Sequence, residues 1–143
     1  MTVFQHAVKL LAARDYTVTG LREKLIRKFG EAPEEVIQQL IAKRFLNDRR
    51  YAENYIATRK KRGAARLREE LIARGIAVSL ADEILSATEW PSLPIALATK
   101  MSGWNLRAPL QPRDAARLFR ALVSLGYEGD AVREEIEQKL HEK

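Results

Sequence analysis

Apolar residues recur at the spacing of amphipathic helices along almost the whole chain. Stripes occur at Phe4, Ala7, Val8 and Leu11, at Leu21, Leu25 and Phe29, at Val36, Ile37, Leu40 and Ile41, and at Tyr51, Ala52, Tyr55 and Ile56. A spacing of three and four residues places side chains on one face of a helix. Sustained alternation of apolar and polar residues, which would predict β-strands, is absent from the sequence. The pattern therefore predicts an all-α protein.

Residues that favour helix ends divide this pattern into nine predicted helices. Thr17 and Asn47 are suited to cap the second and fourth helices, and Pro33 lies where the first turn of the third would begin. Ser79 with Asp82 resembles a capping box, which predicts a helix start at Ser79. Prolines in the last third of the chain fence off a helix near residues 93–102 and a loop over residues 103–112.

A pair of leucines four residues apart, followed directly by isoleucine or valine, occurs three times, each time in the middle of three predicted helices. The pairs are Leu21 and Leu25, Leu67 and Leu71, and Leu118 and Leu122, at separations of 46 and 51 residues. Gly75 and Gly126 follow the second and third of these helices at the same place, and Gly30 follows the first helix one residue later. The sequence predicts three tandem three-helix repeats over residues 1–45, 46–89 and 90–143, stacked as one structural unit in an elongated array.

Composition narrows the cellular setting of the protein. The chain of 143 residues contains no cysteine, which excludes disulfides and thiolate metal sites and fits a reducing cytoplasm. Residues 1–9 lack the pattern of a secretory signal, and no apolar run approaches the ~20 residues needed to span a membrane. We expect a cytoplasmic protein with no membrane contact.

The sequence offers no convincing catalytic machinery. Its two histidines, His6 and His141, lie near the ends of the chain, and no glycine-rich phosphate loop occurs. The acidic pair at Glu134 and Glu135 consists of helix neighbours, which do not share a face. We therefore expect no enzyme, no catalytic residue, no metal, no cofactor and no small-molecule substrate.

Positive charge is concentrated between residues 49 and 74. Only three acids, Glu53, Glu69 and Glu70, oppose nine basic residues there, so this window carries the whole net charge of +6. The candidate residues for binding a partner or DNA are Arg49, Arg50, Arg59, Lys60, Lys61, Arg62, Arg66, Arg68 and Arg74. A one-signed segment of this kind predicts an anionic partner, such as nucleic acid, a nucleoprotein or an acidic protein surface.

Several of these side chains also have a purely structural interpretation. Residues 59–62 are predicted to end the fourth helix, where cations complement the negative end of the helix dipole. That interpretation does not explain the arginines on the next helix. Tyr55 could stack on bases or pack in the core, and Arg59 could form a buried pair or hydrogen bond. Trp104, in a predicted loop, is a candidate for an exposed partner anchor.

The sequence resembles a known family, the RecX regulatory proteins, which are bacterial modulators of the RecA recombinase. The resemblance is carried by Phe45-Leu46-Asn47-Asp48-Arg49-Arg50-Tyr51-Ala52, Tyr55-Ile56, Arg59, Gly63, Arg66-Leu67-Arg68, Glu70-Leu71 and Arg74-Gly75-Ile76. It extends to residues 13–25 and 122–127, and so covers nearly the whole chain. The turn after Gly63 is shorter than the family's, and Gly20 stands where the family tends to have glutamate.

The resemblance implies three tandem three-helix repeats and a regulatory role in DNA repair, DNA recombination and the SOS response. Its implied partner is the RecA filament on single-stranded DNA, whose ATPase, strand-exchange and co-protease activities it would inhibit or modulate. We expect a monomer, and direct contact with the DNA is left open. Two alternatives remain: a DNA-binding protein acting without a recombinase, sequence-independent or by a helix-turn-helix, and an interaction scaffold that needs no DNA.

Overall fold

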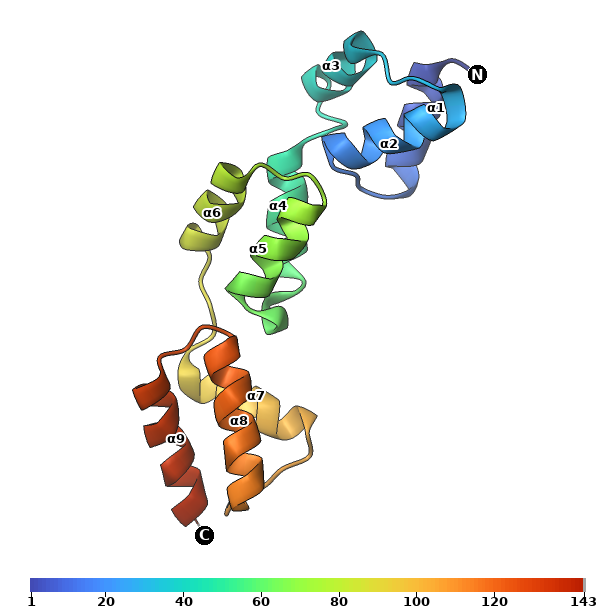
Figure 1. Ribbon diagram of the computed structural model, residues 1–143. Helices are drawn as coiled ribbons and strands as arrows, with labels where there is room; N and C mark the ends of the chain where they lie inside the picture. The colour runs from blue at the N-terminus through green and yellow to red at the C-terminus, as the bar shows by residue number, and fades with distance from the viewer. Residues whose placement is uncertain (143) are drawn as a thin grey trace. The chain divides into compact units, whose positions relative to one another are not determined.

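The computed structural model describes residues 1–142, and these residues form nine α-helices and one 3-10 turn but no strand (Figure 1). The helices are α1 (Val3–Ala13), α2 (Val18–Phe29), α3 (Glu34–Ala42), α4 (Asp48–Ala57), α5 (Ala64–Ala73), α6 (Val78–Ala87), α7 (Leu93–Gly103), α8 (Pro112–Ser124) and α9 (Gly129–His141). The 3-10 turn η1 (Lys60–Arg62) lies between α4 and α5. The all-α prediction is confirmed.

The middle helix of each set of three buries its leucine pair completely. Leu21, Leu25, Leu67, Leu71, Leu118 and Leu122 all have 0% of their surface exposed. The third helix of each set adds further buried residues, which are Ile37, Leu40, Ala81, Ile84, Leu85, Val132 and Ile136. The pattern that predicted tandem three-helix repeats is thus the pattern of the cores, while the repeat boundaries at residues 45 and 89 stay a prediction.

Packing groups the chain into two compact units that differ from a simple division by repeats. The first unit contains residues 1–59 and 67–88, and therefore α1 to α4, most of α5, and α6. The second unit contains residues 60–66 together with the chain from Glu89 onward, and therefore η1, the first turn of α5, and α7 to α9. A short basic segment from the middle of the sequence thus belongs to the same unit as the last three helices.

The predicted helix starts agree with the structure at two of three side-chain caps. The Thr17 hydroxyl accepts a hydrogen bond from the Gly20 backbone at 2.9 Å, and the Asn47 side chain accepts one from the Arg50 backbone at 3.0 Å. The predicted cap at Ser79 is wrong, because α6 already begins at Val78 and its preceding residue makes no side-chain cap. Pro33 lies one residue before α3 rather than inside its first turn.

The three repeat glycines end their helices in the left-handed region, as their spacing predicts. Their φ angles are 80° at Gly30, 93° at Gly75 and 105° at Gly126. After Gly75 the Ile76 backbone N–H donates to the Leu71 carbonyl at 3.0 Å, which closes the end of α5. Glycine adopts this conformation without the steric penalty that a Cβ atom brings.

Three close contacts join the start of α2 to the second set of helices in the first unit. The Thr17 hydroxyl donates to the Arg74 carbonyl at 2.7 Å, and the Val18 N–H donates to the Asp48 carboxylate at 2.8 Å. A Cβ atom at Gly75 would lie only 2.3 Å from the Thr19 side chain. Burial raises the pKa of the Asp48 carboxyl, and the hydrogen bond from Val18 opposes that rise.

Replacing Gly75 or Gly30 by alanine separates backbone strain from crowding. At Gly30 a Cβ atom would meet nothing within 4 Å, so Gly30→Ala should lose only about 1–2 kcal/mol of unfolding free energy to the positive φ. Gly75→Ala should lose about 1–3 kcal/mol more, because the new methyl group overlaps Thr19. Urea unfolding followed by circular dichroism measures both values, and equal losses would contradict this close packing.

Candidate partner-binding surface

The nine basic residues predicted to bind a partner are divided between the two units. Arg49, Arg50, Arg59, Arg68 and Arg74 belong to the first unit, and Lys60, Lys61, Arg62 and Arg66 belong to the second. The candidate cations of the two units therefore have different residues around them.

Two of the candidate arginines in the first unit form ion pairs on the surface. Arg49 Nη2 lies 2.6 Å from the Glu83 carboxylate, and Arg68 Nε lies 2.7 Å from Asp82 Oδ1. All four side chains are about half exposed, so these pairs contribute little to stability. The hydrogen bond from Arg68 lowers the pKa of the Asp82 carboxyl. An anionic partner would compete with these carboxylates for the two guanidinium groups.

Arg50 holds the turn between α3 and α4. Its guanidinium donates to the carbonyls of Arg44 at 2.9 Å and Phe45 at 3.3 Å. Arg44 has a φ of 63°, which is unusual for a residue with a side chain. The positive charge of Arg50 therefore also serves the backbone of this strained turn.

Tyr55 is the centre of a cation–aromatic stack in the first unit. The guanidinium carbons of Arg59 and Arg74 lie 3.9 Å and 4.8 Å from the centre of its ring. The Tyr51 ring stacks at a centroid distance of 6.0 Å. Tyr55 is 4% exposed and its hydroxyl donates to Glu70 at 3.2 Å. The ring is therefore part of the core, where it positions two of the candidate arginines.

The basic run after α4 is not part of that helix. The prediction that residues 59–62 end the fourth helix is wrong, because α4 ends at Ala57. The Arg59 N–H donates to the Ile56 carbonyl at 3.0 Å, three residues back, and residues 60–62 form the separate turn η1. The Thr58 hydroxyl also bonds the Asn54 carbonyl at 3.1 Å. The dipole of α4 therefore does not account for the cations of η1.

Contacts within the second unit fix the basic turn. The Lys60 amine donates to the Glu89 carbonyl at 2.8 Å. A Cβ atom at Gly63 would lie 2.8 Å from Leu125 Cδ2, and Gly63 also has a positive φ of 81°. Only glycine fits this approach to the end of α8 without movement. The sequence pattern around Gly63 gave no sign of this long-range contact.

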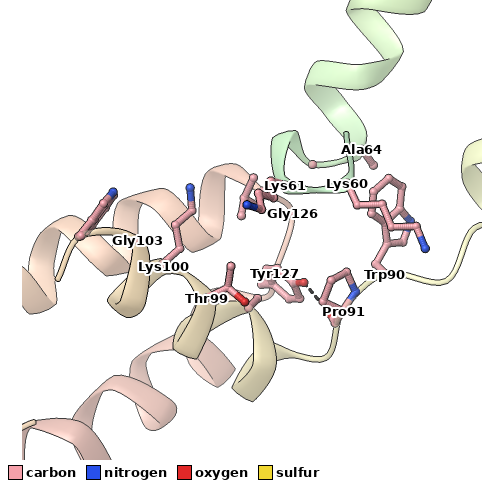
Figure 2. Close-up of a pocket in the computed structure, with 14 residues that line it drawn as sticks. Lys60, Lys61, Ala64, Trp90, Pro91, Thr99, Lys100, Gly103, Gly126 and Tyr127 are labelled. Carbon is pink, nitrogen blue, oxygen red and sulfur yellow. Dashed lines mark hydrogen bonds between the residues drawn. The ribbon is translucent and has the colours of Figure 1, made fainter. Parts of the chain in front are cut away.

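The basic turn forms one wall of a pocket of about 670 Å³, shown in Figure 2. Three lysines, Lys60, Lys61 and Lys100, and three aromatic residues, Trp90, Trp104 and Tyr127, are among its lining residues. The Tyr127 hydroxyl donates to the Pro91 carbonyl at 2.5 Å. Burial raises the pKa of that hydroxyl. The described residues that line the pocket include no aspartate and no glutamate.

Trp104 is less available than an exposed anchor would be. It caps the end of α7 and is half-buried against the core of the last three helices. The Arg117 guanidinium lies 4.5 Å from the centre of its ring, and the Lys100 amine lies 5.8 Å away. Trp104 is thus half-buried in the turn after α7 and its ring is part of the pocket wall, while its role as a partner anchor stays a prediction.

The cations of residues 60–66 set the charge of the second unit. From Glu89 to the end of the chain, eight basic and eight acidic residues cancel. Residues 60–66 add Lys60, Lys61, Arg62 and Arg66 and no acid. The net positive charge of this unit thus comes from the segment that forms the wall of its pocket.

Residues 1–142 hold neither a metal-binding cluster nor a membrane-spanning helix. No cluster of three or more histidine, aspartate or glutamate side chains suited to a metal ion occurs in this range. Within the same range, every helix is too short or too polar to cross a lipid bilayer.

Comparison with known proteins gives relatives over nearly the whole length of the chain. The family model described as RecX, second three-helix domain, matches residues 47–85. The chain is 32% identical over 142 residues to the regulatory protein RecX of Trichlorobacter lovleyi, covering 92% of each protein. It is 33% identical over 142 residues to the regulatory protein RecX of Leptothrix cholodnii, covering 95% of this chain and 88% of the relative.

Further similarity extends to a thermophile and to a solved structure. The regulatory protein RecX of Thermus thermophilus is 36% identical over 124 residues, covering 85% of this chain and 81% of the relative. The crystal structure of RecX from Lactobacillus salivarius superposes with a TM-score of 0.69 and 21% identity, covering 96% of this chain and 94% of that one. At 21% identity, the similarity to the Lactobacillus salivarius structure shows a shared fold only.

Replacing Arg68 tests whether this arginine is held by Asp82. The hydrogen bond keeps the pKa of Asp82 below its usual value, so the pair stabilises the fold above the unfolded pKa. That stabilisation is lost as the pH falls through the folded pKa. Arg68→Gln should therefore raise the pKa of Asp82 in a carboxyl NMR titration. The control Arg49→Gln breaks the pair with Glu83 and should leave the pKa of Asp82 unchanged. If the pKa of Asp82 also stays unchanged in Arg68→Gln, the pairing of Arg68 with Asp82 is contradicted.

Proposed function

Because the chain belongs to the RecX family of regulatory proteins, we propose that it regulates the RecA recombinase by binding its filament on single-stranded DNA. In this role it inhibits or modulates the ATPase, strand-exchange and co-protease activities of the filament. The observation that carries the proposal is similarity to regulatory proteins RecX over more than nine-tenths of the chain. Its relatives are named as regulators, which fits action by binding rather than by catalysis.

The proposed contacts to the filament are made by exposed cations. A RecA filament on DNA presents phosphates and protein surface, and positive side chains are attracted to its anionic parts. Arg66 and Arg68 on α5 and Lys61 in η1 are exposed. Arg68 can exchange Asp82 for a phosphate at small loss, because an exposed pair of this kind is weak.

Other arginines have a supporting part in this proposal. Arg59 and Arg74 lie against the buried Tyr55 ring, and Arg50 holds the carbonyls of a turn. Replacing them changes the local structure as well as the charge. Variants of these arginines are therefore a poor test of filament binding, because a loss of binding could come from the changed structure. Their guanidinium groups still add to the positive charge of the surface.

The cellular location and the oligomeric state of the protein belong to the same proposal. We place the regulator in the cytoplasm as a monomer, with neither cofactor nor metal, where the recombinase and its DNA are found. Direct contact with single-stranded DNA inside the filament follows if the cations reach the phosphates. A DNA-binding protein that acts without a recombinase remains the alternative.

Neutralising α5 tests the proposal. The unaltered protein should inhibit DNA-dependent ATP hydrolysis by the cognate recombinase at substoichiometric amounts. The double variant Arg66→Gln with Arg68→Gln should need about ten times more protein for half inhibition, since lost charge pairs weaken association by a kcal/mol or more. The matched control, Arg113→Gln with Arg120→Gln, removes the same charge from exposed positions of α8 and should inhibit normally.

Two outcomes would overturn this function. The first is normal ATP hydrolysis with no association of the protein with the filament. The second is binding to naked DNA with strong sequence preference at physiological salt and no effect of the recombinase, which would favour the DNA-binding alternative. Circular dichroism of both double variants checks that the helices remain folded.

A further inference from the structure

The pocket of the second unit combines an apolar interior with a positive rim. Its wall is formed by η1 and the start of α5, the segment before α7, α7 itself, and the turn after α8 (Figure 2). Trp90, Leu125 and Tyr127 contribute apolar surface, and Lys61 and Lys100 bring amines to the same pocket. Its volume of about 670 Å³ is in the range typical of ligand-binding sites.

The charge of the rim is not balanced within the pocket. Lys60 donates to a neutral carbonyl, that of Glu89, so the bond places its amine without cancelling the charge. Lys61 is exposed, and no carboxylate is among the described lining residues. A ligand that places negative groups at the rim would therefore gain favourable electrostatic interactions.

The interior favours an apolar group over a nucleic-acid base. The Thr99 hydroxyl already donates to the Ile95 carbonyl at 2.9 Å, and the Tyr127 hydroxyl donates to Pro91. The donor and acceptor edges of a base would lose water in the pocket with few new partners, which costs free energy. Arg117 and Lys100 also lie over the Trp104 ring, where a base would otherwise stack.

We infer that this pocket binds an acidic peptide segment by one aromatic or aliphatic side chain. The anchor side chain enters the apolar interior beside Trp90, and carboxylates that flank it in the peptide pair with Lys61 and Lys100. Burial of an anchor supplies affinity, while the rim charges select acidic neighbours and speed association. The inference rests on this pocket alone and is tested without any recombinase, so it stands apart from the proposed function.

The two tryptophans give a direct readout. Both tryptophans of the chain, Trp90 and Trp104, line the pocket, so intrinsic fluorescence reports on its occupation. The probe is a short peptide of aspartates and glutamates around one phenylalanine, which adds no tryptophan signal. Addition of this peptide should shift the tryptophan emission, and the shift should saturate as the pocket fills. A peptide with serine in place of phenylalanine should bind at least about ten-fold more weakly, because it lacks the anchor. Added salt should weaken binding.

Variants of the wall identify the site of binding. Lys61→Glu should weaken the phenylalanine peptide several-fold by placing like charges together, and Thr99→Phe should weaken it by filling the pocket from α7. Arg113→Glu makes the same charge change at an exposed position of α8 that does not line the pocket, and should bind normally. Because Lys61 is exposed, its variant keeps the test valid even if Thr99→Phe perturbs the helix.

Three results would overturn the inference. One is no saturable fluorescence change with the phenylalanine peptide up to millimolar concentration. Another is equal binding of the phenylalanine and serine peptides, which would show only nonspecific charge attraction. The third is tighter binding of oligothymidylate than of the peptide, with the same sensitivity to Lys61→Glu and Thr99→Phe, which would assign the pocket to single-stranded nucleic acid.

Discussion

Burial of one leucine pair in the middle of every three-helix set is the constraint on which the remaining structure depends. The helices are only 9 to 13 residues long, and helices this short are marginal in isolation. They gain stability by closing around Leu21 and Leu25, Leu67 and Leu71, and Leu118 and Leu122. Each middle helix is followed within two residues by a glycine with positive φ, which turns the chain toward the third helix of its set.

Because apolar residues fill these small cores, the charged residues lie on the surface and in the connections between helices, where the candidate functional features are found. In the first unit, Tyr55 packs in the core and carries Arg59 and Arg74 against its ring. In the second unit, Gly63 brings the basic turn against Leu125, which places lysines beside an apolar pocket. The close contact that Gly63 allows with Leu125 therefore also positions the lysines of η1 at the pocket.

The sequence was sufficient to predict the helices and the repeats, because these depend on local periodicity and on caps such as Thr17 and Asn47. It was not sufficient for features that depend on residues far apart in the chain. Asp82 matched a short capping pattern but pairs with Arg68 on the preceding helix. The run after α4 matched a helix end but forms its own turn, held by the Glu89 carbonyl. Trp104 lay in a predicted loop, yet Arg117 of α8 covers its ring.

The most direct test of the central claim is co-sedimentation of this protein with the cognate RecA recombinase. The recombinase is assembled with a nonhydrolysable ATP analogue on single-stranded DNA, and the amount of bound protein is compared with that on the DNA alone and on the recombinase alone. If the protein binds the filament, the assembled filament should retain it strongly, and the DNA alone or the recombinase alone should retain much less of it. Equal retention by naked DNA, or no retention by the filament, would contradict it.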